Sequence, residues 1–163
     1  LFRSRPDFPD PFGTRFNLWG RYVRALRCGE YIPFHPDGSA FLFSRAAFGR
    51  PYDDDYFIYH EDVCLGWRAW LEGKEVVLAE ASRAETFDGG STRRIKYLTA
   101  WYTERNRWLN YLSFLSVSTL ARVFPLLVMD ALAKLFFGSN RLAKLSAWAW
   151  LFSSPLKIGR AHV

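Results

Sequence analysis

The spacing of apolar residues along the middle of the chain predicts two strands that flank one helix. A short apolar run in GSAFLFSRAAF (38–48) is typical of a buried strand. In HEDVCLGWRAWLEG (60–73) the apolar residues Val63, Trp67, Trp70 and Leu71 recur at helical spacing and predict its buried face. KEVVLAEA (74–81) has a second run that is typical of a strand. The pattern therefore predicts the order strand, acidic loop, helix, strand.

From Trp101 onward the pattern predicts long helices with a broad apolar face. The run 108–121 carries no charge, and the five charges that follow fall within roughly a third of the helical circumference: Arg122, Asp130, Lys134, Arg141 and Lys144. Pro125 would kink or restart a helix, so we expect two or three segments. No stretch reaches the roughly 18 apolar residues of a membrane-spanning helix.

Two interpretations of these C-terminal helices remain open. They could lie in the membrane interface, with Trp148 and Trp150 at headgroup depth and the basic residues towards anionic lipid. Alternatively, they could pack on the rest of the protein or on another subunit. We expect the protein to associate peripherally with the cytoplasmic face of the bacterial inner membrane.

Composition and charge narrow the class of protein. A chain of 163 residues with 50% hydrophobic and 18% aromatic residues can build one globular core. The formal net charge of +6 suits a phosphate-bearing substrate or an anionic membrane as well as nucleic acid. Cys28 and Cys64 form neither a disulfide framework nor a metal-ligand spacing. The ending KIGRAHV (157–163) matches a translated sequencing adapter, so we expect a non-native tail on a fragment.

Three stretches, in this order, resemble the second half of a family 2 glycosyltransferase of the GT-A type. They are GSAFLFSRAAF, GRPYDDDYFIYHEDVCLGWRAWLEGKEVVLAEA and WYTERNRWLNYL, and the resemblance covers roughly 36–115. It is greatest to the rhamnosyltransferase-like members that build bacterial cell-surface polysaccharides. The resemblance implies an α/β fold: residues 1–100 would be the C-terminal half of a Rossmann-like nucleotide-diphosphosugar transferase domain. Amphipathic helices (101–156) would follow it.

The resemblance assigns catalysis to the acidic pair at the start of the predicted helix. Asp62 would be the general base that deprotonates the acceptor hydroxyl, and Glu61 would orient the acceptor or support the base. The plainer alternative is that the pair merely caps a helix N-terminus. Gly38 and Ser39 would let the chain approach the donor sugar and the acceptor closely, although a turn explains the glycine almost as well. Asp53 would shape the mouth of the pocket.

Further site residues follow from the same resemblance. Glu85 stands near the position where many relatives place a metal-binding His, although loop solvation explains it equally well. Arg105 could neutralise the diphosphate leaving group. Arg107 and Trp108, with Glu104, have the spacing of the Gln-x-x-Arg-Trp motif that lies near the acceptor in processive relatives.

The expected function is that of an inverting glycosyltransferase fragment, inactive alone. It would help to transfer a sugar from a nucleotide-sugar donor to a lipid-linked or polysaccharide acceptor in cell-surface glycan biosynthesis. A divalent metal, Mg²⁺ or Mn²⁺, would be bound mainly by the missing N-terminal half. The alternative is a non-catalytic, membrane-associated module that binds a carbohydrate or a protein partner. Nucleic acid is not an expected partner, because the acidic loop would repel phosphate.

Overall fold

The computed structural model shows a chain that is mainly helical where its structure is described. The described residues are 14–16, 22–24, 34–36, 38, 40–77, 79 and 95–153. Their helices are α1 (Arg45–Phe48), the 3₁₀ turn η1 (Asp54–Tyr56), α2 (Glu61–Leu71), α3 (Lys96–Phe114), α4 (Val117–Phe137) and α5 (Arg141–Ser153). Two short strands, β1 (Thr14–Phe16) and β2 (Tyr22–Arg24), pair in antiparallel register with Arg15 opposite Val23.

The predicted α/β fold is wrong for the described part of the chain. Residues 40–44 and 74–77 have no regular secondary structure, and the end of the first expected strand, 45–48, forms α1 instead. A buried strand needs neighbouring strands to bond its backbone and cover its side chains. Among the described residues β1 and β2 pair only with each other, and Leu42 in the expected strand is fully exposed. The described residues within 1–100 therefore do not form the expected Rossmann-like half-domain.

The predicted helix at 60–73 is confirmed as α2, and its end follows from one glycine. Gly73 adopts φ +67°, which an L side chain rarely takes. The Gly73 N–H donates to the carbonyl of Trp70 at 3.1 Å, and the Lys74 N–H donates to that of Ala69 at 2.8 Å. This pair of bonds is the Schellman motif, which satisfies the last carbonyls of the helix.

The buried face of α2 differs from the predicted one. Val63 is buried as expected, but Trp70 and Leu71 are 39% and 66% exposed. The buried side instead includes Gly66, where a Cβ would come within 2.5 Å of the Cβ of His35. The glycine thus allows the segment 34–36 to lie directly against α2. This contact buries the side of α2 that carries Gly66, and not the side that carries Trp70 and Leu71.

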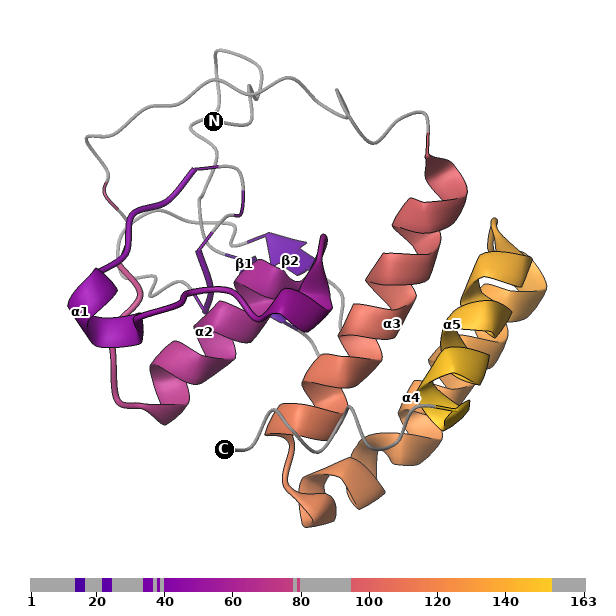
Figure 1. Cartoon of the computed structure of the whole chain (residues 1–163). Coiled ribbons are helices and arrows are strands. Elements are labelled where there is room, and N and C mark those ends of the chain that lie inside the picture. The colour runs from indigo at the N-terminus through magenta and orange to yellow at the C-terminus, as the bar shows by residue number, and fades with distance from the viewer. Residues whose placement is uncertain are drawn as a thin grey trace, which may run out of the picture.

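The three C-terminal helices contain most of the helical residues of the described structure (Figure 1). α3 packs against α2 on one side and α5 on another, and α4 packs against α5. α3 therefore joins the two regions that were expected to separate near residue 100. Pro125 was expected to kink or restart a helix; it lies inside α4 and does not restart it. The breaks fall instead at Ser116, whose side chain caps α4, and at Gly138–Asn140.

Candidate functional site

An unusual loop presents the acidic pair at the start of α2. Phe57, Tyr59 and His60, which lie just before Glu61, all have positive φ angles of 33°, 65° and 64°. Residues other than glycine seldom adopt this conformation, because the Cβ crowds the backbone. Three such residues within four positions persist only when surrounding contacts stabilise them. The stabilising contacts come from α3.

Two buried asparagines of α3 hold this loop. The side-chain amide of Asn106 donates towards the carbonyls of Tyr56, Ile58 and Tyr59 at 3.2, 2.8 and 2.7 Å. One turn later, Asn110 donates to the carbonyl of His60 at 3.2 Å and accepts from the Tyr56 hydroxyl at 2.6 Å. Both asparagines are fully or almost fully buried. We call Asn106 and Asn110 the asparagine clamp. Their side chains donate hydrogen bonds to backbone carbonyls of the loop that precedes α2.

Arg105 completes the attachment of the loop to α3. Its guanidinium donates to the carbonyl of Asp55 and, at 2.8 Å, to the side-chain oxygen of Asn106. The same group lies 4.8 Å from the ring centre of Trp150 and 5.1 Å from that of Trp101. Burial lowers the pKa of Arg105, and nearby tyrosine and aspartate side chains partly offset this effect. The residue predicted to meet a diphosphate thus has two of its donor nitrogens engaged, one with the loop and one with Asn106.

The carboxylate of Asp62 is fixed by backbone donors. It accepts from the N–H of Gly38 at 3.3 Å and from the N–H of Val63 at 2.8 Å. His35 Nδ1 lies 3.7 Å from Asp62 Oδ2 and 2.7 Å from the carbonyl oxygen of Pro36. The Asp62 side chain is 15% exposed, so part of it remains accessible. This arrangement holds the carboxylate in one orientation.

The surroundings of Glu61 raise the pKa of its carboxyl group, so it binds a proton more readily than an exposed glutamate does. Burial raises the pKa of Glu61, and the negative charge of Asp62 raises it further. Its Oε2 atom is buried and has no hydrogen-bond partner among the described residues. Burial, followed by the charges of Glu61 and Asp62, also raises the pKa of Tyr52 to about 12. Glu61 and Asp62 are therefore a partly desolvated anionic pair, which we call the carboxylate pair.

Gly38, predicted from the sequence to approach the donor sugar and the acceptor, lies against the carboxylate pair in this structure. A Cβ built on Gly38 would lie 3.4 Å from Asp62 Oδ2 and 3.6 Å from Glu61 Oε1. These are ordinary contact distances, so an alanine would fit but would cover the two oxygens. Ser39 and Glu85, also named from the sequence, lie outside the described residues. Asp53 caps η1, and its carboxylate accepts from the N–H of Asp55 at 2.9 Å.

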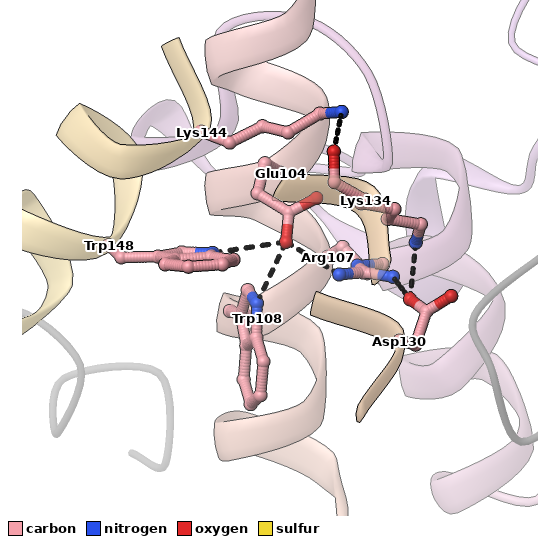
Figure 2. A network of polar contacts seen from close by, with 7 residues as sticks. All are labelled: Glu104, Arg107, Trp108, Asp130, Lys134, Lys144 and Trp148. Atoms are coloured by element: carbon pink, nitrogen blue, oxygen red, sulfur yellow. Dashed lines mark hydrogen bonds and ion pairs between the residues drawn. The ribbon is translucent and has the colours of Figure 1, made fainter. Parts of the chain in front are cut away.

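Arg107 and Trp108 belong to a buried polar network between α3, α4 and α5 (Figure 2). One oxygen of Glu104 accepts from Arg107 at 2.5 Å, from Trp108 at 3.0 Å and from Trp148 at 3.1 Å. Arg107 also donates to Asp130 at 2.7 Å. The Arg107 side chain is only 3% exposed. The Glu-x-x-Arg-Trp spacing thus joins three helices in this structure.

Sequence reasoning missed the residues that position the carboxylate pair. Asn106, Asn110 and His35 were not among the predicted site residues, although the Arg-Asn helix had been noted as a matching stretch. An available signal was the i, i+4 spacing of Asn106 and Asn110 on a helix rich in aromatic residues. Two short amides on one helical face can bond a neighbouring backbone.

The expected metal is not matched by a cluster of ligands in the described part of the chain. There, no three His, Cys, Asp or Glu side chains are placed so that they could hold a metal ion. The carboxylate pair alone offers too few ligands, so we derive no chemical step through a metal. Glu85 stays a prediction.

Comparison of the chain with family models, with curated proteins and with solved structures finds no match. A function must therefore be inferred from the arrangement of the residues themselves. The carboxylate pair, with its clamped loop, is the part of the described structure in which acidic groups, partial burial and a rigid support coincide.

Proposed function

We propose that the chain supplies the acceptor-side carboxylates of an inverting glycosyltransferase, with Asp62 as the general base. The observation that carries the proposal is the carboxylate pair, held at the start of α2 with Gly38 against it. The motif order, which resembles rhamnosyltransferase-like family 2 enzymes, gives independent support from the sequence. The proposed substrates are a nucleotide-sugar donor and a lipid-linked or polysaccharide acceptor.

The chemistry needs a fixed base next to an acceptor hydroxyl. As the acceptor oxygen bonds to the anomeric carbon, the bond from that carbon to the nucleoside diphosphate breaks, and the leaving group keeps the electron pair. Asp62 takes the proton from the acceptor oxygen. Its two backbone hydrogen bonds fix the orientation of the carboxylate, so little rearrangement is needed during the reaction.

Glu61 and Gly38 have supporting roles in this proposal. The negative charge of Glu61 next to Asp62 favours uptake of a proton by the pair, because protonation relieves the repulsion between like charges. Gly38 leaves space beside both carboxylates, which a larger residue would fill. The donor nucleotide and its metal would be held mainly by residues outside this chain.

The test compares variants of the full-length protein in an assay of nucleoside diphosphate release from nucleotide sugars. Replacement of Asp62 by Asn keeps the size of the side chain but removes the base. We expect kcat to fall by about 10² to 10⁴, with the KM for the donor nearly unchanged. Glu61→Gln should lower kcat by a smaller factor, because it removes a supporting charge and not the base.

Asp54→Asn is the matched control. Asp54 belongs to the same acidic stretch, but its side chain is 79% exposed and pairs only with the exposed Arg50 among the described contacts. Its turnover should equal that of the unmodified protein. Undiminished turnover in Asp62→Asn would refute the assignment of the base, and equal losses in Asp62→Asn and Asp54→Asn would point to a general charge effect.

A further inference from the structure

Two of the three charged residues of α4, Asp130 and Lys134, are turned towards the protein and not towards its surroundings. Asp130 is 6% exposed and bonds to Arg107 of α3. Lys134, one turn later, pairs with Asp130 at 2.5 Å (Figure 2). Lys144 of α5 also turns inward and donates to the backbone carbonyl of Lys134 at 3.1 Å. These charges form the inner side of the helix pair.

The solvent-facing side of α4 carries mainly apolar side chains, whereas an ordinary surface helix exposes its polar side chains. Amphipathic helices on protein surfaces bury their apolar stripe and expose their charges. On α4, however, Met129, Phe136 and Phe137 are 61%, 63% and 90% exposed. We define the α4 apolar face as the set of exposed large apolar side chains on this helix: Val117, Phe124, Leu126, Met129, Leu132, Phe136 and Phe137.

Further exposed apolar residues on α5 add to this surface. Leu142, Leu145 and Phe152 are 74%, 43% and 85% exposed, and α5 packs against α4. Scattered exposed apolar residues are common, but ten large ones on two packed helices are not. Such a surface is covered in the working state of a protein, because its exposure to water is unfavourable.

The accessible charges beside this surface have one sign. Asp130 is the only acidic residue between Arg105 and Ser153 in the sequence, and it is buried. Arg122 of α4 and Arg141 at the start of α5 are both exposed. An exposed apolar face that also presents exposed arginines, with no accessible acid on these two helices, is complementary to anionic lipid headgroups above an acyl layer.

We propose that the α4 apolar face lies on an anionic lipid bilayer, with the polar network of α3 and α4 on the side away from the lipid. In the part of the chain that the structure describes, none of the helices has the length and apolarity needed to cross a membrane. α4 would therefore lie along the interface, immersed by its outer side. Arg122 and Arg141 carry the attraction to anionic headgroups, and Lys134, which was expected to do so, pairs with Asp130.

The test measures how much of the full-length protein floats with vesicles of phosphatidylcholine alone or with 30 mol% phosphatidylglycerol (roughly a physiological anionic fraction). The double variant Met129→Ser/Phe136→Ser removes two exposed apolar side chains from the centre of the face. Binding should weaken about tenfold or more, because each side chain loses apolar burial in the bilayer. Arg122→Gln should weaken binding to the anionic vesicles about fivefold and leave binding to phosphatidylcholine unchanged.

The matched control is Leu71→Ser/Val77→Ser, which replaces two equally exposed apolar residues away from α4 and α5. This variant should bind like the unmodified protein. Equal binding by the Met129→Ser/Phe136→Ser variant, or equal loss in the control, would overturn the proposal. The proposal would also be overturned if the protein does not bind vesicles but forms a dimer, and if Met129→Ser/Phe136→Ser dissociates that dimer. A second copy of the chain would then cover the α4 apolar face. Circular dichroism of each variant shows whether its helices remain intact.

Discussion

At the scale of single residues, the environment of each titratable group decides its role more than its type does. Glu61 and Asp62 are adjacent in sequence, yet Asp62 accepts backbone hydrogen bonds while one oxygen of Glu61 is buried without such a partner. His60, which precedes them, is 3% exposed, and burial lowers the pKa of its imidazole to about 3. The nearby positive charge of Arg107 lowers that pKa further. His60 is therefore a neutral part of the support for the carboxylate pair at neutral pH.

The buried His60 should make the protein sensitive to acid. In the unfolded chain His60 binds a proton below about pH 6.5, whereas in the folded chain it stays neutral down to about pH 3. The unfolded state thus binds more protons in this window, so the free energy of unfolding falls as the pH is lowered from 6.5 towards 3. His60→Asn, which tolerates the positive φ angle, should flatten this dependence. Urea unfolding at several pH values measures the free energy of unfolding of both proteins. If this free energy changes with pH equally in the unmodified protein and in His60→Asn, the lowered pKa of His60 is wrong.

At the scale of elements, α3 supports the start of α2 through the asparagine clamp. Backbone that lies outside helices and sheets must find other hydrogen-bond partners when it is buried. Asn106 supplies donors to three successive or near-successive carbonyls, which no apolar side chain could do. The position of the carboxylate pair therefore depends on asparagines that lie more than 40 residues later in the sequence.

Replacement of Asn106 by Ala should loosen the loop before α2 more than the rest of the protein. The change leaves the carbonyls of Tyr56, Ile58 and Tyr59 without these donors, which should cost about 2–4 kcal/mol of unfolding free energy. Hydrogen exchange at 55–62 should accelerate, while exchange in α5 changes only with global stability. Ser113→Ala, at another buried polar position of α3, is the control. Unchanged local protection in Asn106→Ala would show that other contacts hold the loop.

At the scale of the whole molecule, a polar network joins the three C-terminal helices. Arg107 pairs with Glu104 and Asp130, and the side chains of all three are at most 6% exposed. The attraction within such a network is strong because water is excluded, but each charge also loses its hydration. The network therefore favours one arrangement of helices, since other arrangements would leave buried charges unpaired.

Removal of one buried charge should destabilise the protein far more than removal of an exposed one. Asp130→Asn leaves Arg107 and Lys134 with one negative partner fewer, and we expect a loss of about 3 kcal/mol in the free energy of unfolding. Asp54→Asn breaks an exposed pair with Arg50 and should cost about 0.5 kcal/mol or less. Denaturant unfolding of both variants provides the comparison. Similar losses would mean that the network adds little beyond surface charge pairing.

The longer helices could be predicted from the sequence, but the loss of the expected strands in the described residues, the short helix α1 and the outward side of α4 could not. Helical spacing located α2 because an amphipathic helix carries its own periodic signal. The apolar run at 41–43 carried no such signal, and its burial depended on partner strands that the described structure lacks. Likewise, the spacing of Asp130 and Lys134 placed both on one stripe of α4 but could not show that the stripe faces Arg107.

The candidate site also has parts that could be predicted from the sequence and parts that could not. Glu61 and Asp62 were predicted from a motif, and the structure places Gly38 beside them. Asn106 and Asn110 were missed because an asparagine on a helix has many possible uses, and only the three-dimensional path of the loop shows which carbonyls it meets. Local spacing thus reveals the acidic groups, whereas their support comes from contacts distant in sequence.

The bonding of two tryptophans to one oxygen of Glu104 gives the protein an intrinsic spectroscopic reporter. Trp108 lies on α3 and Trp148 on α5, and both indole N–H groups meet the same buried carboxylate. A proton shared with a carboxylate resonates downfield in NMR spectra and exchanges slowly with solvent when it is buried. The two indole signals therefore report on whether α5 is docked on α3, without an added label and at a point separate from the carboxylate pair.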